Sequence, residues 1–285
     1  MQTIHPCLWF NTQAEEAAHL YTSVFQNSKI GKIARYSAAG AQASGQKEGS
    51  VMIVEFELDG HKIIGLNGAP HFKFTPAFSL FVWRDSENEI DRLWEAISHG
   101  GDIRMGLDKY PWAARYGWTA DRYGVEWQFM LSDKQEIAPA FLFVDKLFGK
   151  GEEAIRFYMS VFKNSKTEFM ARDETTNTIV HGVFSLDGTS FALMEGKGEH
   201  HFTFSPAFSL VVTCQTQEEI DHYWTKLSHD PAAEQCGWLK DKYGVSWQIV
   251  PSILSDLMTD PKSRERVMKV LLQMKKLEIE KLKQA

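Results

Sequence analysis

The stretch HFKFTPAFSLFV at residues 71–82 occurs a second time in the chain, as HFTFSPAFSLVV at residues 201–212. Nine of these twelve positions are identical. A second pair keeps the same order: GWTADRYGVEWQ at 117–128 returns as GWLKDKYGVSWQ at 237–248, with eight identities. A repeat of this length indicates two whole domains rather than a solenoid of short units. We therefore expect one domain at residues 1–135 and another at residues 136–285.

Each half has the same order of expected elements. Residues 4–10 alternate between apolar and polar positions, as in a strand, and an amphipathic helix follows. Residues 50–58 and 61–66 are expected to form a hairpin around Asp59-Gly60. A strand at 77–82, a helix from residue 86 and a strand at 125–131 complete the half. The chain is therefore predicted to be α+β, with two βαβββ units in each half.

One expected element has no counterpart in the first half. Asp260-Pro261 is a typical helix start, and an extra C-terminal helix is expected to run to about Lys283. This helix could face an anionic surface with its lysines and arginines, or pack on its own core; the second role is usual for an amphipathic helix.

Composition limits the classes of partner. The 285 residues contain 31 Lys and Arg against 37 Asp and Glu, and the excess of three negative charges is the same in both halves. Neither half therefore has the charge of a basic nucleic-acid module. No apolar stretch is long enough to cross a membrane, no signal peptide is evident, and three widely spaced cysteines suit a reducing compartment. We expect a cytoplasmic protein that binds a small molecule, with a homodimer as one option for its assembly.

Several motifs resemble one known family. They are WF at 9–10, QAEEA at 13–17, FxNS at 25–28 and 162–165, LNG at 66–68 and the stretch 236–251. Together they are similar to the PhnB-like branch of the vicinal-oxygen-chelate superfamily, which includes glyoxalase I, extradiol dioxygenases and bleomycin-resistance proteins. Members of this branch are often labelled 3-demethylubiquinone-9 3-methyltransferase. The resemblance covers nearly the whole chain and implies two tandem glyoxalase-like domains, in which pairs of βαβββ units curl into cupped mixed sheets.

The resemblance also implies where a divalent metal would sit in active members. Its four ligands come from the first and last strands of each unit, and the metal chelates neighbouring oxygens of a substrate. Of the matching positions, Ala77, Ala138 and Ala207 cannot bind a metal. Exchange of units between domains, which occurs in related proteins, does not complete either set. We therefore expect no conventional metal site and no cofactor.

The remaining positions still offer candidate ligand-binding residues. His5 could be a base, a partial ligand or a hydrogen-bonded residue of the cup. Glu195, at the position of Asn67, could be a general base or an exposed residue at a strand end. Strand alternation places serines and glutamines inward, while the neighbouring Phe, Leu and Val residues face the helices. The expected ligand-binding set is His5, Asn67, Ser79, Trp118, Gln128, Glu195, Ser209, Trp238 and Gln248.

These residues predict a protein that binds a small, partly apolar molecule in a sheet cup without a complete metal site. His5 and Asn67 would make the first cup neutral, whereas Glu195 would make the second more acidic. The alternative is an enzyme of glyoxalase, dioxygenase or transferase type with an atypical site. A third option is that one cup is vestigial and serves only as an interaction surface. The sequence assigns no catalytic residue.

Overall fold

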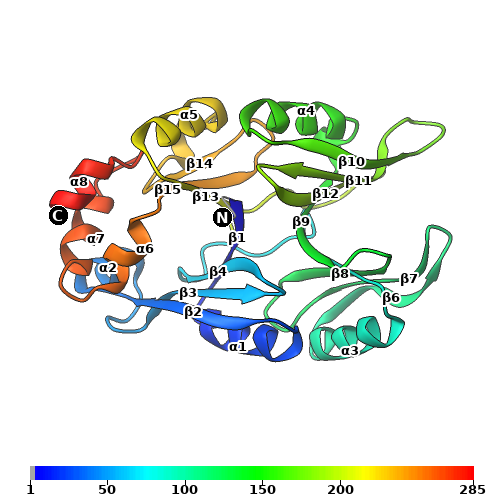
Figure 1. Ribbon diagram of the computed structural model, residues 1–285, viewed down its shortest axis with the longest axis horizontal. Coiled ribbons are helices and arrows are strands. Elements are labelled where there is room, and N and C mark those ends of the chain that lie inside the picture. The colour runs from blue at the N-terminus through cyan, green and yellow to red at the C-terminus, as the bar shows by residue number, and fades with distance from the viewer. Residues whose placement is uncertain (1–3) are drawn as a thin grey trace.

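The computed structural model describes residues 4–285, which form two mixed β-sheets (Figure 1). Sheet A contains, in order, β14 (Trp238–Lys240), β15 (Ser246–Pro251), β13 (Phe208–Cys214), β1 (Ile4–Phe10), β4 (His61–Asn67), β3 (Val51–Leu58) and β2 (Lys29–Arg35). Sheet B contains, in order, β10 (Lys166–Arg172), β11 (Ile179–Leu186), β12 (Thr189–Glu195), β9 (Glu136–Phe143), β5 (Phe78–Arg84), β8 (Glu126–Leu131), β7 (Ala113–Ala120) and β6 (Asp102–Tyr110).

Each sheet is a pair of βαβββ-type units, but the two units come from different halves of the chain. Strand β1 pairs antiparallel with β13, and β5 pairs antiparallel with β9. The first half therefore supplies one unit to sheet A and one to sheet B, and so does the second half. The expectation that each half closes its own cup is corrected by this strand order. The division near residue 135 separates the sequence repeats, and each sheet contains strands from both sides of that division.

The hairpin between β3 and β4 forms where the sequence predicts it. Asp59 and Gly60 both have positive φ, of 54° and 79°, and Leu58 pairs with His61 across the turn. Asp187 and Gly188 repeat this geometry in the second half, with φ of 48° and 77°. Two central residues with positive φ give the turn a twist that matches the twist of the flanking strands.

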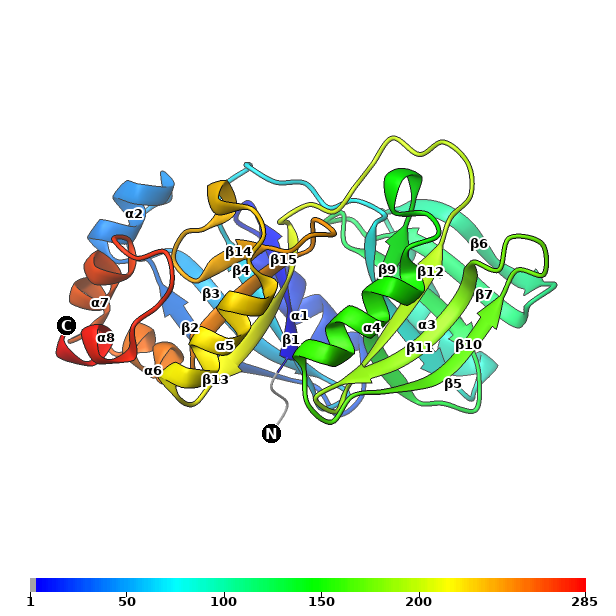
Figure 2. The same ribbon diagram turned by 90° about the horizontal axis from the view of Figure 1, so that it is seen from above.

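Helices cover one face of each sheet (Figure 2). Helices α1 (Ala14–Val24) and α5 (Gln217–Leu227) pack on sheet A, and α3 (Glu87–Ser98) and α4 (Gly151–Val161) pack on sheet B. As predicted, Phe78, Leu80, Val82, Phe208, Leu210 and Val212 belong to the core on this helix-covered side. The rings of Phe78 and Phe208, which are equivalent in the repeat, stack with centroids 4.3 Å apart where the two halves meet. Short 3-10 helices lie at η1 (Asp145–Leu147) and η2 (Pro231–Ala233).

The predicted long C-terminal helix is broken into short pieces. They are α7 (Arg264–Leu271) and α8 (Ile279–Gln284), and a further helix, α6 (Leu254–Thr259), ends just before the expected start at Asp260. With α2 (Ala38–Ser44), these helices lie at the opposite, concave side of sheet A. Between α7 and α8, the carbonyls of Met274 and Lys275 accept hydrogen bonds from the backbone N–H groups of Cys236 and Gly237, which are distant in sequence. Those carbonyls are therefore not available to a continuous helix. None of the helices within residues 4–285 combines the length and apolar character needed to cross a bilayer.

The repeated stretches 117–128 and 237–248 each build a buried carboxylate site. Asp241 accepts hydrogen bonds from the Tyr158 hydroxyl at 2.8 Å, from the Trp247 indole at 2.8 Å, and from two backbone N–H groups. Asp121 accepts the equivalent bonds, including those of Tyr21 and Trp127. Burial raises the pKa of both carboxyl groups. The motif that carries the family resemblance is therefore structural, because it ties a helix next to one sheet to a turn next to the other.

Candidate functional site

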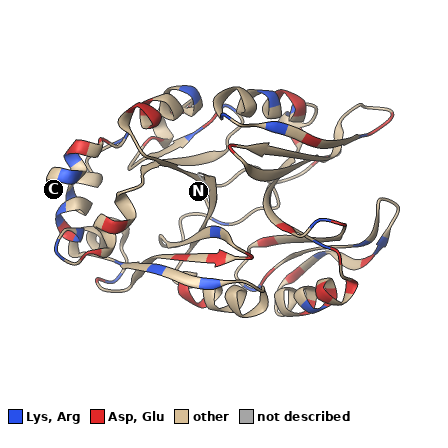
Figure 3. Ribbon diagram, in the orientation of Figure 1, with Lys and Arg blue, Asp and Glu red and all other residues tan. Residues whose placement is uncertain are grey.

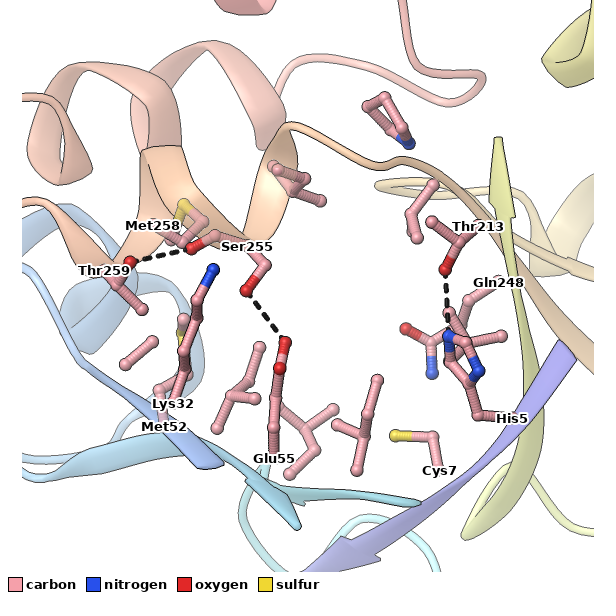
Figure 4. A pocket seen from close by; sticks show the side chains of 18 of the residues that line it. His5, Cys7, Lys32, Met52, Glu55, Thr213, Gln248, Ser255, Met258 and Thr259 are labelled. Carbon is pink, nitrogen blue, oxygen red and sulfur yellow. Dashed lines mark hydrogen bonds between the residues drawn. The ribbon is translucent and has the colours of Figure 1, made fainter. Parts of the chain in front are cut away.

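A cavity of about 220 Å³ lies between the concave face of sheet A and the helices α6 and α7 (Figure 4). We call this space cup A. Its wall is mostly apolar and includes Ala34, Met52, Ile64, Leu66, Val211, Trp238, Val250, Leu254, Met258, Met268 and Leu271. Polar groups are few and come mainly from strands of both halves. A cavity with an apolar wall and a few convergent polar groups is the usual form of a small-molecule site.

His5 lies on β1 with its ring against this cavity. Its Nε2 is 2.9 Å from the Thr213 hydroxyl, and its Nδ1 is buried without a hydrogen bond that meets normal geometry. Only 3% of the residue is exposed. Burial, and secondly the charge of Lys62, lower the pKa of His5 from its ordinary value of 6.5 to about 4. The imidazole is therefore neutral at physiological pH.

A carboxylate links the floor of cup A to its helical cover. Glu55 on β3 accepts a hydrogen bond of 2.8 Å from the Ser255 hydroxyl on α6. Its other oxygen lies 3.1 Å from the Lys62 ammonium. A second ion pair joins Lys32 on β2 to Asp256 on α6, nearer to solvent. The charges at cup A are thus paired with each other, and the cavity is close to neutral.

The opposite wall of cup A carries an amide and a thiol. Gln248 on β15 donates from Nε2 to the Ser209 hydroxyl at 3.0 Å. Cys7 lies beside both residues, and burial raises the pKa of its thiol to about 11. A thiol with that pKa is not ionised at neutral pH, so it is a poor nucleophile. Trp238 also lines the cavity, and its ring meets Trp9 edge to face at 5.9 Å between centroids.

The concave face of sheet B, which we call cup B, holds three further predicted residues. Gln128 donates to the Ser79 hydroxyl at 2.9 Å and accepts from the Tyr116 hydroxyl at 2.6 Å. The Trp118 indole donates to Glu126 at 2.8 Å. The Ser–Gln pair of cup A is therefore repeated, but in cup B the amide oxygen also accepts a hydrogen bond from Tyr116.

The two cups differ at the positions that the repeat makes equivalent. Cup A has His5, Cys7, Glu55, Val211 and Thr213. The corresponding residues of cup B are Ala138, Ala140, Val183, Phe81 and Trp83, and they pack together as an apolar cluster. The Phe81 and Trp83 rings stack at 4.4 Å and occupy space that is open in cup A. These positions are thus polar and line a cavity in cup A, whereas apolar side chains fill them in cup B.

The predicted binding residues Asn67 and Glu195 do not line either cup. Asn67 accepts from the first N–H of α1, at Ala14, and donates to the carbonyl of Val51. Glu195 accepts from Gly151 at the first turn of α4 and from Ile179. Both residues therefore lie on the helix-covered side and cap helices whose N-terminal N–H groups need acceptors. The expectation that they set the polarity of the two cups is corrected.

The donor set does not fit the metal that the fold family implies. The matching positions bring His5 and Gln248 to cup A and Gln128 to cup B, whereas Ala77, Ala138 and Ala207 supply no donor. Within residues 4–285, no three His, Cys, Asp or Glu side chains group closely enough to hold a metal ion. Several convergent ligands are needed for tight binding.

Comparison with known proteins agrees with this architecture. A family model described as 3-demethylubiquinone-9 3-methyltransferase matches residues 2–130 and again residues 135–250. The chain belongs to this family. A solved structure from Bacillus cereus, described as a putative 3-demethylubiquinone-9 3-methyltransferase and PhnB protein, is 39% identical, with a TM-score of 0.43. The match covers 100% of that chain and 46% of this one.

Members of the wider fold match over more of the chain. A glyoxalase I mutant from Zea mays has a TM-score of 0.57 at 10% identity, covering 87% of this chain and 94% of the other. A second glyoxalase I mutant from the same plant gives 0.56 at 11%, covering 86% and 90%. At this identity the likeness shows the glyoxalase fold and nothing finer. No curated protein matches the chain.

Some residues of cup A were not singled out from the sequence. Glu55 and Lys62 lie on strands whose positions were predicted, and alternation along β3 could have placed Glu55 on the concave side. Thr213 lies two positions beyond Val211 on the same face. Ser255 carried no such signal, because nothing in its local sequence shows that α6 folds over the sheet.

Proposed function

We propose that this protein binds a small, partly apolar molecule in cup A. The observation that supports the proposal most directly is the cavity of about 220 Å³, with an apolar wall and the polar groups of His5, Glu55 and Gln248. The paired charges of Glu55 and Lys62 favour a neutral ligand over a strongly charged one. The three free cysteines suit a reducing compartment, so we place this function in the cytoplasm.

A catalytic role for His5 is the weaker candidate. A neutral imidazole next to a cavity can accept a proton, as a catalytic base must. This is the observation that favours an enzyme with an atypical site. Proton transfer is most efficient when the pKa of the base lies near the working pH. The pKa of His5, at about 4, is well below that range. The geometry therefore supports binding better than proton abstraction.

The repeat itself supplies the variant that tests the proposal. Val211→Phe with Thr213→Trp would place in cup A the side chains that fill cup B at Phe81 and Trp83. Protein-observed NMR with a panel of small aromatic alcohols and phenols would report binding residue by residue. We expect shifts at His5, Gln248 and Trp238 in the wild-type protein, and their loss in the filled variant.

The matched control is Phe81→Val with Trp83→Thr, which hollows cup B and leaves cup A unchanged. This variant should keep the shifts at cup A. Wild-type binding that persists unchanged in the filled variant would place the ligand site elsewhere. No binding by any compound of the panel would contradict the expected ligand class.

A further inference from the structure

The amide oxygen of Gln248 faces cup A with capacity to accept a hydrogen bond. The amide nitrogen donates to Ser209 at 3.0 Å, and this bond orients the side chain. No group within residues 4–285 donates to the oxygen, and Figure 4 shows it directed toward the open centre of the cavity. An amide oxygen has two lone pairs. A donor on a bound molecule can therefore reach Gln248 without displacing a hydrogen bond of the protein.

The repeat shows what occupies the equivalent acceptor in cup B. There the oxygen of Gln128 accepts a hydrogen bond of 2.6 Å from the Tyr116 hydroxyl, while its nitrogen donates to Ser79. The Tyr116 side chain is buried, and its ring packs near Phe81 on the concave face of sheet B. Burial raises the pKa of the Tyr116 hydroxyl, so the group stays protonated and remains a donor. Cup B thus carries a phenol of its own on its glutamine.

The corresponding residue of cup A leaves this place open. Tyr116-Gly117-Trp118 aligns with Cys236-Gly237-Trp238, so a cysteine stands where cup B has the tyrosine. The Cys236 thiol lines the cavity and donates to the carbonyl of Leu271 on α7 at 3.5 Å, rather than to the glutamine. Its backbone N–H is bonded to the segment between α7 and α8. Cup A therefore has the acceptor of the pair but lacks the tyrosine that occupies it in cup B.

The wall around Gln248 is uncharged. Strands β1, β13 and β15, which carry His5, Thr213 and Gln248, contain no Asp, Glu, Lys or Arg (Figure 3). The ring of His5 is neutral at physiological pH because burial lowers its pKa to about 4. A phenolate or a carboxylate would bring a negative charge against an acceptor oxygen in this wall, and burying an unpaired charge is costly. The wall therefore favours a hydroxyl that keeps its proton.

We propose that cup A binds a neutral aromatic molecule whose hydroxyl donates a hydrogen bond to the amide oxygen of Gln248. The bound ring takes the part that Tyr116 plays on Gln128 in cup B. Its size agrees with the space, because an apolar cavity of about 150 Å³ holds one benzene ring and cup A measures about 220 Å³. A single substituted ring therefore fits. This assignment, which rests on the proposed function, makes Gln248 the residue that sets ligand specificity.

Two ligands that differ only in the hydroxyl test the proposal. The first, p-cresol, is the tyrosine side chain itself, and p-xylene has the same shape with a methyl group in place of the hydroxyl. Their affinities for the wild-type protein and for Gln248→Met, which removes the amide oxygen but keeps a long side chain, form a cycle that isolates the hydrogen bond. We expect the ratio of the two affinities to shift toward p-xylene by about tenfold in the variant, because the bound hydroxyl loses its acceptor.

The matched control is Tyr116→Phe, which removes the equivalent hydrogen bond of cup B and should leave the ratio unchanged. If neither ligand binds the wild-type protein at millimolar concentration, the proposed function itself is contradicted. If both bind and their ratio is the same in the wild type and in Gln248→Met, cup A remains a binding site and recognition of the hydroxyl is overturned.

A measurement on the wild-type protein alone keeps the test independent of folding defects in the variants. The probe is p-nitrophenol, which ionises near neutral pH and absorbs visible light only as the phenolate. A site that accepts a hydrogen bond from the protonated form should raise the pKa of the bound probe, so visible absorbance should fall on binding at neutral pH. Absorbance that rises, because the probe binds as the phenolate, would overturn the proposal.

Discussion

Asp241 shows how one buried side chain can hold two distant elements together. Its carboxylate accepts four hydrogen bonds and is 2% exposed. Asp241→Ala would leave the Tyr158 hydroxyl, the Trp247 indole and two backbone N–H groups without an acceptor. We expect the free energy of unfolding to fall by about 2–4 kcal/mol, since each unsatisfied buried group is costly. Urea denaturation would measure this, with the exposed Asp133→Ala as control; equal stability of the two variants would contradict the role of the site.

His5 makes stability depend on pH in a defined direction. Its pKa is about 4 in the folded protein and 6.5 in an unfolded chain. Between these values the unfolded state binds more protons, so the free energy of unfolding falls as the pH falls through this window. From pH 7.5 to pH 5 the contribution of His5 is about 2 kcal/mol.

The comparison that isolates this effect uses His5→Gln. His181, whose pKa is also lowered to about 4 by burial, contributes in the same direction in both proteins. Chemical denaturation at the two pH values should therefore show a smaller loss in the variant, by about 2 kcal/mol. An identical loss in wild type and variant would show that His5 is accessible to protons in the folded state.

At the scale of elements, strand ends cap the helices of their own units. Glu195→Ala removes the acceptor for Gly151 and Ile179, and we expect a loss of about 1–2 kcal/mol. Ligand binding at cup A should not change, because Glu195 lies on the helix-covered side of sheet B. Denaturation and NMR titration would test both points. A variant of full stability with altered binding would return Glu195 to the list of site residues.

The C-terminal helices form a separate apolar cluster with α2 and sheet A. Leu277, which is fully buried, lies in this cluster and contacts the turn at Gly237. Leu277→Ala should cost about 2–4 kcal/mol, as expected for a large-to-small change in a core. Hydrogen exchange should then be faster in α6, α7 and α8 than in β1 and β13. Uniformly faster exchange would show that this cover unfolds only together with the rest of the molecule.

Local patterns predicted these elements well where a short signal decides the structure. Asp59-Gly60 fixes its hairpin, and alternation correctly places Ser79 and Gln128 opposite Leu80. The same approach missed the orientation of Asn67, because the N–H that it accepts belongs to a helix 53 residues away in sequence. The break in the C-terminal helix was missed for a similar reason, since the segment between α7 and α8 is hydrogen-bonded to the distant Cys236 and Gly237.

At the scale of the whole molecule, the pairing of units was not predictable from the sequence. Strands β5 and β13 share the sequence FSL at 78–80 and 208–210. Pairing of β1 with either strand would therefore bring it against nearly the same side chains. The structure pairs β1 with β13. Because the two repeats are so similar, the sequence does not show which units form each cup. The set of residues that lines cup A could therefore not be predicted.

This pairing predicts how a single half would behave. A fragment of residues 1–135 would contain β1 and β5, whose partners β13 and β9 lie in the other half. Unpaired strand edges favour association, and β5 can stand in for β13. We expect light scattering to show a dimer of this fragment at micromolar concentration. A folded fragment that remains monomeric would show that each half can close its own sheet.

The crossing of units between halves has a consequence for how the two cups can change. In a symmetric dimer of identical one-repeat chains, every substitution would change both cups at once. Residues 132–135 join the two halves into one chain. The residues of cup A and cup B are then encoded separately, so a substitution can change one cup and leave the other unchanged. His5 can thus stand beside Thr213 in one cup while Ala138 and Trp83 close the other. The short linker therefore allows a single polypeptide to keep a cavity in cup A and to fill the equivalent positions of cup B with apolar side chains.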